Sequence, residues 1–299
     1  IEVARALQTP LEVSHLKAIG GRNARKAVPE MLSLIARARE EGLDVMCDAY
    51  PYTAGSTQLI HVLPPEFQAG GTETLTKRLR DRAAREEMRA RMETGSDFEN
   101  ITLLVGFENV VGIGLRTDEY RRFEGKSIAE IALALGKDPY DALFDLLAAE
   151  KCEAGMIDYI SDEEDLKAIL RAPFSGVISD ATYPGTGQVH PRVYGAFARL
   201  IETYVVREKV LTLEQAVHKV TQQAAERFSF AGKGKIEVGA DADLLLFAPE
   251  KIRERGTYLT PKACASGFDE VFVLGERVIE NGEYRGGSSG EMLGLRMEY

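Results

Sequence analysis

The stretch LEVSHLKAIGGRNARKAVPEMLSLIARAREEGLDVMCDAY (residues 11–50) decides the fold. Residues 11–16 form a strand candidate, and residues 27–41 place apolar side chains at the spacing of a helix. Gly42 follows in the position where helices commonly end, and residues 45–50 are a second apolar strand candidate. A strand, a covering helix and another strand predict a parallel βαβ unit.

The same alternation of strand and helix patterns continues to about residue 230. We expect further strands at 101–105, 156–160 and 176–179, and helices at 127–135, 139–150, 163–171, 192–208 and 212–227. Thr212 and Gln215 are spaced as a capping box at the start of the last helix. The highly charged stretch 74–92 is expected to be an exposed helical insertion.

These units predict an α/β fold of the (β/α)8 TIM-barrel type. A whole barrel takes about 250 residues, and residues 1–232 supply about half of its units once an insertion around 64–100 is discounted. The chain begins without Met and inside an αβ unit. We therefore expect the C-terminal half of a barrel, with the other half encoded upstream.

Residues 233–299 have a different character. Short strands are expected at 233–239, 242–248, 270–274, 277–280 and at Tyr284, and Asn281-Gly282 is a strong hairpin signal. This segment holds no convergent set of histidines, cysteines or carboxylates. It is expected to be the C-terminal part of a small β-sandwich with a structural role.

Composition excludes several classes of function. The 299 residues are 44% hydrophobic and carry a net charge of −10, which argues against nucleic-acid binding. No apolar run approaches the roughly 20 residues that a membrane-spanning helix needs, so no membrane partner is expected. The widely spaced Cys47, Cys152 and Cys264 favour a reducing compartment, and we expect a cytoplasmic protein.

Polar residues gather at three predicted strand ends. Period-two alternation would place His15 and Lys17 on one face, and Asp48 and Tyr50 on one face of the next strand. Asp180 ends a third strand. In a barrel these ends share the mouth where catalytic groups collect, although each residue taken alone has an ordinary structural interpretation.

Two of these positions suggest specific chemistry. A buried Asp180 must be paired, bind a metal or move protons, because burying an unpaired charge is expensive. A Gly-rich loop then leads to Arg192, which either clamps a carboxylate or forms an ordinary surface salt bridge. His61 is a weak candidate for substrate contact, and His218 is expected to be a structural histidine on a helix.

The motifs SHLK (14–17), DAYPYTAGST (48–57), SD (179–180) and HPRVYG (190–195) resemble the N-acyl-D-amino-acid deacylases, or D-aminoacylases, of the amidohydrolase superfamily. The resemblance covers essentially the whole chain. It implies zinc-dependent hydrolysis of the amide bond of N-acyl-D-amino acids, a small-molecule substrate, and a homo-oligomer as one possible assembly.

The resemblance also implies a role for individual residues. The implied roles are metal binding for His15, substrate binding for Lys17, Tyr50, Ser56 and Arg192, and proton transfer for Asp180. Asp180 would take a proton from a metal-bound water and return it to the leaving amine, while Arg192 would hold the substrate's free carboxylate.

Three departures from the family pattern matter. Ala181 replaces the usual glycine after Asp180, and no second histidine follows on the next strand, where Asp48 is the inward group that could substitute. The family's His-x-His pair and bridging ligand would lie upstream of Ile1. We therefore expect this chain alone to be inactive. The alternatives are a hydantoinase- or dihydroorotase-like cyclic amidohydrolase and an inactive scaffold without the metal site.

Overall fold

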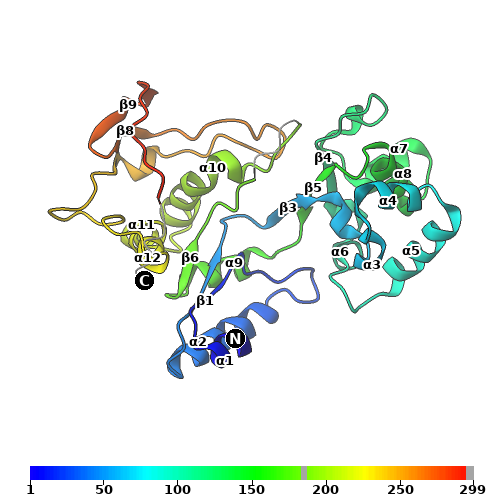
Figure 1. Cartoon of the computed structure of the whole chain (residues 1–299). Helices are drawn as coiled ribbons and strands as arrows, with labels where there is room; N and C mark the ends of the chain where they lie inside the picture. The colour runs from blue at the N-terminus through cyan, green and yellow to red at the C-terminus, as the bar shows by residue number, and fades with distance from the viewer. Residues whose placement is uncertain (183–186, 294–299) are drawn as a thin grey trace.

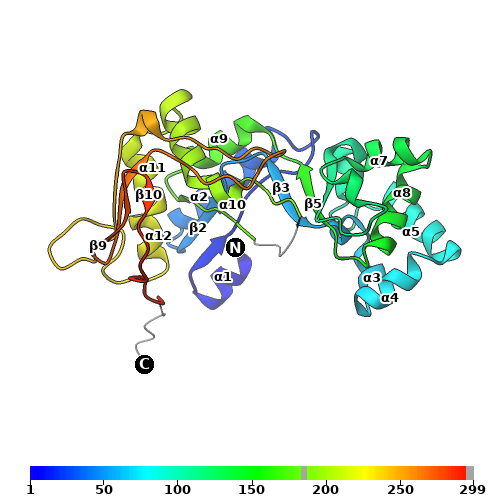
Figure 2. The ribbon, with the colours of Figure 1, turned by 90° about the horizontal axis from the view of Figure 1, so that it is seen from above.

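The computed structural model describes residues 1–182 and 187–293. Residues 183–186, in the Gly-rich loop after Asp180, lie outside the described part. Figure 1 shows a parallel sheet near the N-terminus, a group of helices to one side of it and, to the other side, the antiparallel sheet that contains β8 (Phe268–Val273) and β9 (Glu276–Glu280). Figure 2 shows the same separation from above.

The parallel sheet contains β1 (Leu11–Val13), β2 (Val45–Ala49) and β6 (Ser175–Val177), hydrogen-bonded in the order β1-β2-β6. Helix α2 (Ala27–Glu40) joins β1 to β2, and α9 (Glu163–Arg171) precedes β6. Both helices contribute to one core with the sheet, which includes Val28, Ile35, Val45, Cys47, Leu166, Ile169, Leu170 and Val177. The parallel βαβ unit predicted from residues 11–50 is confirmed.

After β2, the chain enters a second sheet, which is antiparallel. Its strands are β3 (Ala54–Gln58), β4 (Val110–Ile113) and β5 (Gly155–Tyr159), paired in the order β3-β5-β4. The strand predicted at 156–160 is therefore confirmed as β5. The α/β class is confirmed too, whereas half of a barrel stays a prediction, because the described parallel sheet has three strands.

Helices pack on the second sheet, and we call them the helical module. They are α3 (Pro65–Gln68), α4 (Gly71–Arg78), α5 (Arg82–Thr94), α6 (Ile101–Val105), α7 (Ile128–Leu135) and α8 (Pro139–Ala149), with the 3-10 turns η1 (Leu59–Val62), η2 (Phe107–Asn109) and η3 (Arg121–Phe123). The strand predicted at 101–105 is wrong. The Asn100 side chain accepts a hydrogen bond from Leu103 N and so begins a short helix there.

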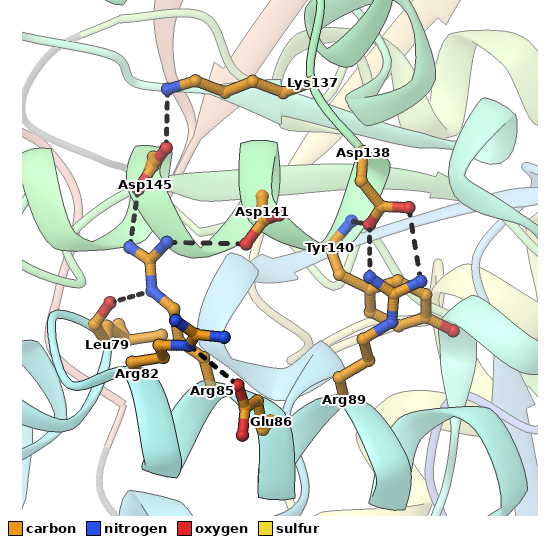
Figure 3. A network of polar contacts seen from close by, with 10 residues as sticks. All are labelled: Leu79, Arg82, Arg85, Glu86, Arg89, Lys137, Asp138, Tyr140, Asp141 and Asp145. Atoms are coloured by element: carbon orange, nitrogen blue, oxygen red, sulfur yellow. Dashed lines mark hydrogen bonds and ion pairs between the residues drawn. The ribbon is translucent and has the colours of Figure 1, made fainter.

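The charged stretch 74–92 is also not simply exposed. Its helices bury Leu75, Leu79, Met88 and Met92 in the core of the module. On another face of α5, Arg85 pairs with Asp141 and Asp145 of α8, and Arg89 pairs with Asp138 (Figure 3). The arginines thus attach α5 to α8, which the charge pattern alone did not indicate.

Two helical segments cover the parallel sheet after β6. The first is α10 (Arg192–Arg199), which continues as the π-helix η4 (Leu200–Arg207). The second is α11 (Leu213–Val220) with α12 (Gln222–Arg227), separated at Thr221, whose φ of −127° and ψ of −91° are not helical. The predicted capping box is present, because Thr212 N donates to Gln215 Oε1 (2.9 Å) and Gln215 N to Thr212 Oγ1 (3.2 Å).

The C-terminal sheet contains β7 (Leu244–Phe247), β8 (Phe268–Val273), β9 (Glu276–Glu280) and β10 (Glu283–Tyr284), all antiparallel. The predicted hairpin joins β9 to β10, with φ of 53° at Asn281 and 78° at Gly282. The strand predicted at 233–239 is wrong: Gly234 and Gly239 have positive φ, and no strand forms between them. A second layer that would complete a sandwich stays a prediction.

Two short elements remain, α1 (Glu2–Leu7) at the N-terminus and the 3-10 turn η5 (Pro249–Lys251) after β7. Among residues 1–182 and 187–293, no helix has the length and apolar character needed to cross a membrane.

Candidate functional site

His15 lies in the turn after β1, where Asp48 of β2 holds it. Asp48 Oδ1 accepts hydrogen bonds from Ser14 Oγ (3.0 Å) and from the backbone N of His15 (2.6 Å). His15 has a φ of 44°, a left-handed conformation that histidine tolerates better than most residues. The alternation argument for His15 and Lys17 is therefore wrong, since β1 ends at Val13.

His15 and Lys17 meet nonetheless. Lys17 Nζ lies 3.1 Å from His15 Nδ1 and donates to the backbone oxygen of His15 at 3.0 Å. Burial lowers the pKa of Lys17, and the nearby Asp180 and Asp158 oppose this shift. The predicted proximity of an imidazole and an ammonium group is thus observed, produced by a turn instead of a strand face.

Tyr50 follows β2, and two cations lie over its buried ring. Lys17 Nζ is 5.6 Å and Arg192 Cζ is 4.6 Å from the ring centroid, within the range of cation–π attraction. Burial raises the pKa of the Tyr50 hydroxyl, so the phenol is neutral at physiological pH. Tyr50 therefore connects the turn after β1 with the start of α10.

Asp180 forms an ion pair with Arg192, whose Nη1 lies 2.8 Å from Asp180 Oδ2. The side chain of Arg192 is 3% exposed and that of Asp180 is 31% exposed. Arg192 therefore forms a salt bridge, as one of its two interpretations expects, but the guanidinium is buried and does not lie at the surface, and carboxylate binding stays a prediction. Asp180 follows β6, which ends at Val177, and has a φ of 47°, so left-handed residues stand after two of the three parallel strands.

Ser56 takes part through its backbone. Arg192 Nη2 donates to the Ser56 carbonyl oxygen at 3.1 Å, whereas the Ser56 hydroxyl donates to Met156 O of β5 at 2.8 Å. The contacts therefore form a continuous series from His15 through Lys17, Tyr50 and Arg192 to Asp180, with Ser56 beside it.

Sequence analysis missed Asp158 of β5. Asp158 is 3% exposed, and its Oδ1 has no hydrogen-bond partner among the described residues. It pairs across the sheet with Gly55, where a Cβ atom would lie 2.7 Å from Oδ1. Burial raises the pKa of Asp158 to about 6, while Lys17 and Arg192 act in the opposite direction. The glycine in the TAGST segment was the available signal.

His190 is the second residue that sequence analysis left without a role. It is 2% exposed, and its ring nitrogens contact Arg192 N and Ala54 O, each at 3.0 Å. His61 and His218 are exposed on η1 and α11, respectively.

The described residues do not by themselves fit a complete zinc centre. They contain no group of three His, Cys, Asp or Glu residues placed to hold a metal ion. Asp48 Oδ1 accepts two hydrogen bonds, and Asp180 Oδ2 contacts Arg192. Because a catalytic zinc usually has three protein ligands, His15 would need partners beyond the described residues.

Comparisons with known proteins point to one family. Residues 125–262 match the Amidohydrolase family. The chain is 29% identical to a D-aminoacylase of Alcaligenes xylosoxydans xylosoxydans, over 97% of this chain and 50% of that protein. An N-acyl-D-glutamate deacylase from the same organism is 30% identical over 92% of this chain and 46% of its own length. The chain thus spans about half the length of these curated relatives.

Solved structures agree with the sequence relatives. A crystal structure of D-aminoacylase superposes with a TM-score of 0.72 at 28% identity and covers 96% of this chain and 50% of its own. The N-acyl-D-glutamate deacylase of Bordetella bronchiseptica, solved with zinc and a phosphonate inhibitor, superposes with a TM-score of 0.71 at 28% identity. That match covers 93% of this chain and 48% of the other.

Proposed function

Because this chain is a relative of the N-acyl-D-amino-acid deacylases among the amidohydrolases, we propose that the full-length protein hydrolyses N-acyl-D-amino acids. The reaction splits the linear amide bond with water and releases a carboxylate and a free D-amino acid. The supporting observation is that Lys17, Tyr50, Arg192 and Asp180 come together from three separate segments.

Arg192 is proposed to bind the substrate's free carboxylate. A guanidinium group has five N–H donors, and the contacts to Asp180 and Ser56 O use one from each of two nitrogens. The remaining donors can form a second, charge-assisted pair of hydrogen bonds. Since Arg192 is buried, such bonds are stronger than they would be in water.

Lys17 and Tyr50 are proposed to complete the anion site. The Lys17 ammonium adds a second positive charge, and the neutral phenol of Tyr50 can donate a hydrogen bond. Lys17 and Arg192 place two positive charges over one aromatic ring and Asp180 pairs with Arg192, so an incoming carboxylate is favoured by charge where it shares or replaces that contact. Ser56 is proposed to contact substrate as well, although its hydroxyl is bound to Met156 O.

Asp180 is proposed to carry the proton. The side chain of Asp180 is more exposed than that of Arg192, and it is therefore accessible to water and to the scissile amide. As a base it would accept a proton from the attacking water, and as an acid it would return that proton to the departing nitrogen. A substrate carboxylate bound to Arg192 would share the guanidinium with Asp180 or replace the present ion pair of Arg192 with Asp180.

Several further properties belong to the same proposal. We propose zinc as the metal, with His15 as one ligand, Asp48 as the candidate for a second, and the remaining ligands outside the described residues. We also propose that the parallel sheet is part of a (β/α)8 barrel over residues 1–232 and that residues 233–299 are part of a β-sandwich. The protein is proposed to be cytoplasmic, and a homo-oligomer is one assembly that is compatible with this proposal.

The test uses the full-length, zinc-loaded protein. N-acetyl-D-amino acids with neutral, acidic and basic side chains should release acetate, the L-enantiomers should not, and a chelator should abolish the reaction. Asp180→Asn should lower kcat by about 10²–10⁴-fold, the usual contribution of acid–base catalysis. Asp118→Asn, at a fully exposed carboxylate, is the matched control and should leave kcat unchanged.

Two outcomes would contradict the proposal. Cleavage of a cyclic amide with no hydrolysis of any N-acyl-D-amino acid would indicate a hydantoinase- or dihydroorotase-like enzyme. Absence of any hydrolysis by the zinc-loaded full-length protein would favour a scaffold role. The 299-residue chain alone is expected to bind zinc weakly and to hydrolyse nothing.

A further inference from the structure

A buried histidine joins the carboxylate-binding arginine to the sheet beside it. His190 lies just before α10, and its Nδ1 is 3.0 Å from the backbone N of Arg192. Its Nε2 is 3.0 Å from the carbonyl oxygen of Ala54, at the start of β3. The two ring nitrogens therefore contact two different elements.

These partners fix the protonation of the ring. A backbone N–H can only donate, so Nδ1 accepts, and a backbone carbonyl can only accept, so Nε2 carries the hydrogen. The imidazole is consequently neutral. Burial, followed by the charge of Arg192, lowers the pKa of His190 to about 3, which agrees with this tautomer. With both nitrogens engaged, His190 has no lone pair free for a metal.

Aromatic rings hold the plane of the imidazole. Tyr52 and Tyr258 contact it edge-on, with centroid distances of 4.9 Å and 5.2 Å and interplanar angles of 89° and 87°. Tyr52 is fixed in turn, because its hydroxyl donates to Glu254 Oε1 at 2.7 Å. The ring has little freedom to rotate away from either hydrogen bond.

The same strand contacts both ends of Arg192. The backbone N of Arg192 reaches Ala54 through His190, and its guanidinium Nη2 donates to Ser56 O, two residues further along β3. We propose that His190 is a positioning residue, which sets the guanidinium of Arg192 for the substrate carboxylate by fixing the start of α10 to β3. This inference rests on the proposed deacylase function.

Two substitutions separate the two hydrogen bonds. The amide of His190→Asn can place an oxygen near the Nδ1 position, which preserves the acceptor for Arg192 N and loses the donor to Ala54 O. The amide of His190→Gln can place a nitrogen near the Nε2 position, which does the opposite. His190→Phe removes both while the ring volume is retained. His218→Asn, at the exposed histidine of α11, is the matched control.

The measurement is the steady-state kinetics of the full-length protein on an N-acetyl-D-amino acid and on its carboxamide, which lacks the negative charge. We expect each single-bond variant to raise KM about five- to tenfold, the effect of one lost hydrogen bond, with kcat within threefold of wild type. His190→Phe should raise KM more than either single-bond variant does. Its ratio of kcat/KM for the carboxylate substrate to kcat/KM for the carboxamide should fall towards the ratio of Arg192→Lys.

A purely structural role gives a different pattern. It would lower the melting temperature and the active fraction, and hence kcat, but would leave KM and the carboxylate preference unchanged. That pattern, or a folded His190→Phe enzyme with wild-type KM, would overturn the inference. A wild-type protein that releases acetate from no N-acetyl-D-amino acid would instead overturn the proposed function first.

Discussion

Replacing Asp158 with Asn should change how the stability of the protein depends on pH. The carboxylate is buried without a hydrogen-bond partner for Oδ1, and its pKa rises from 3.8 to about 6. A raised pKa in an acid means that the folded state disfavours the charged form and binds more protons than the unfolded state. Stability contributed by this group therefore falls as pH rises from about 4 to about 6 and stays low above that range.

The magnitude follows from the two pKa values. A shift from 3.8 to about 6 corresponds to a penalty of about 3 kcal/mol at pH 7.5, of which about 1 kcal/mol is already present at pH 4.5. The Asn amide has its own burial cost, but that cost does not vary with pH. Relative to wild type, the free energy of unfolding of Asp158→Asn should therefore increase by about 2 kcal/mol from pH 4.5 to pH 7.5, so the variant becomes relatively more stable.

Urea unfolding of the full-length protein, followed by circular dichroism at pH 4.5 and 7.5, measures this difference. Glu150→Gln is the matched control, since Glu150 is also buried but accepts hydrogen bonds from Arg116 N (2.9 Å) and Thr117 N (3.0 Å). It should be destabilised by about 1–3 kcal/mol at pH 7.5. A relative stability of Asp158→Asn that does not change with pH, or changes in the opposite direction, would refute the reasoning.

Three further perturbations test other parts of the structure. Arg192→Lys keeps the charge but loses the planar fork, so KM for an N-acyl-D-amino acid should rise about 10- to 100-fold; an unchanged KM would exclude Arg192 from carboxylate binding. Gly55→Ala places a Cβ atom 2.7 Å from Asp158 Oδ1 and should cost about 1–3 kcal/mol in urea unfolding, with a smaller cost when Asp158→Ser is also present. In a double-mutant cycle of Arg85→Met and Asp145→Leu, the coupling energy should be about 1 kcal/mol, and additive effects would show that this ion pair does not stabilise the helical module.

The sequence predicts elements well where the apolar pattern is long and bounded. The helix at 27–41 and the capping box at Thr212 are confirmed because local signals and tertiary packing agree there. Short apolar runs are ambiguous: 101–105 is a helix because Asn100 caps it, and 233–239 has no partner strand. The strand β3 was missed because Gly55, Ser56 and Thr57 lack the apolar residues of a typical strand.

The candidate site was predicted through its motifs, and not through correct local geometry. His15 and Lys17 do lie close together, but strand alternation does not explain their contact, because the backbone turns at His15. The ion pair of Asp180 with Arg192 depends on where α10 starts relative to β6, which no local pattern encodes. Asp158 and His190 were missed for a similar reason, since the contacts of Asp158 with Gly55 and of His190 with Ala54 O join residues more than a hundred positions apart in the chain.

The connection of the helical module has a consequence for how this protein can vary. Covalently, the module is joined to the rest of the chain through β3 and β5, which pair with each other from Ala54 opposite Tyr159 to Gln58 opposite Gly155 (Figure 1). We therefore expect that residues 59–154 can be lengthened, trimmed or exchanged without changing the connections of the parallel sheet, provided that the hydrogen bond from Gln188 N to Glu124 Oε1 is kept. Chimeras that preserve the register of these two crossings are the ones that should retain the arrangement around Arg192.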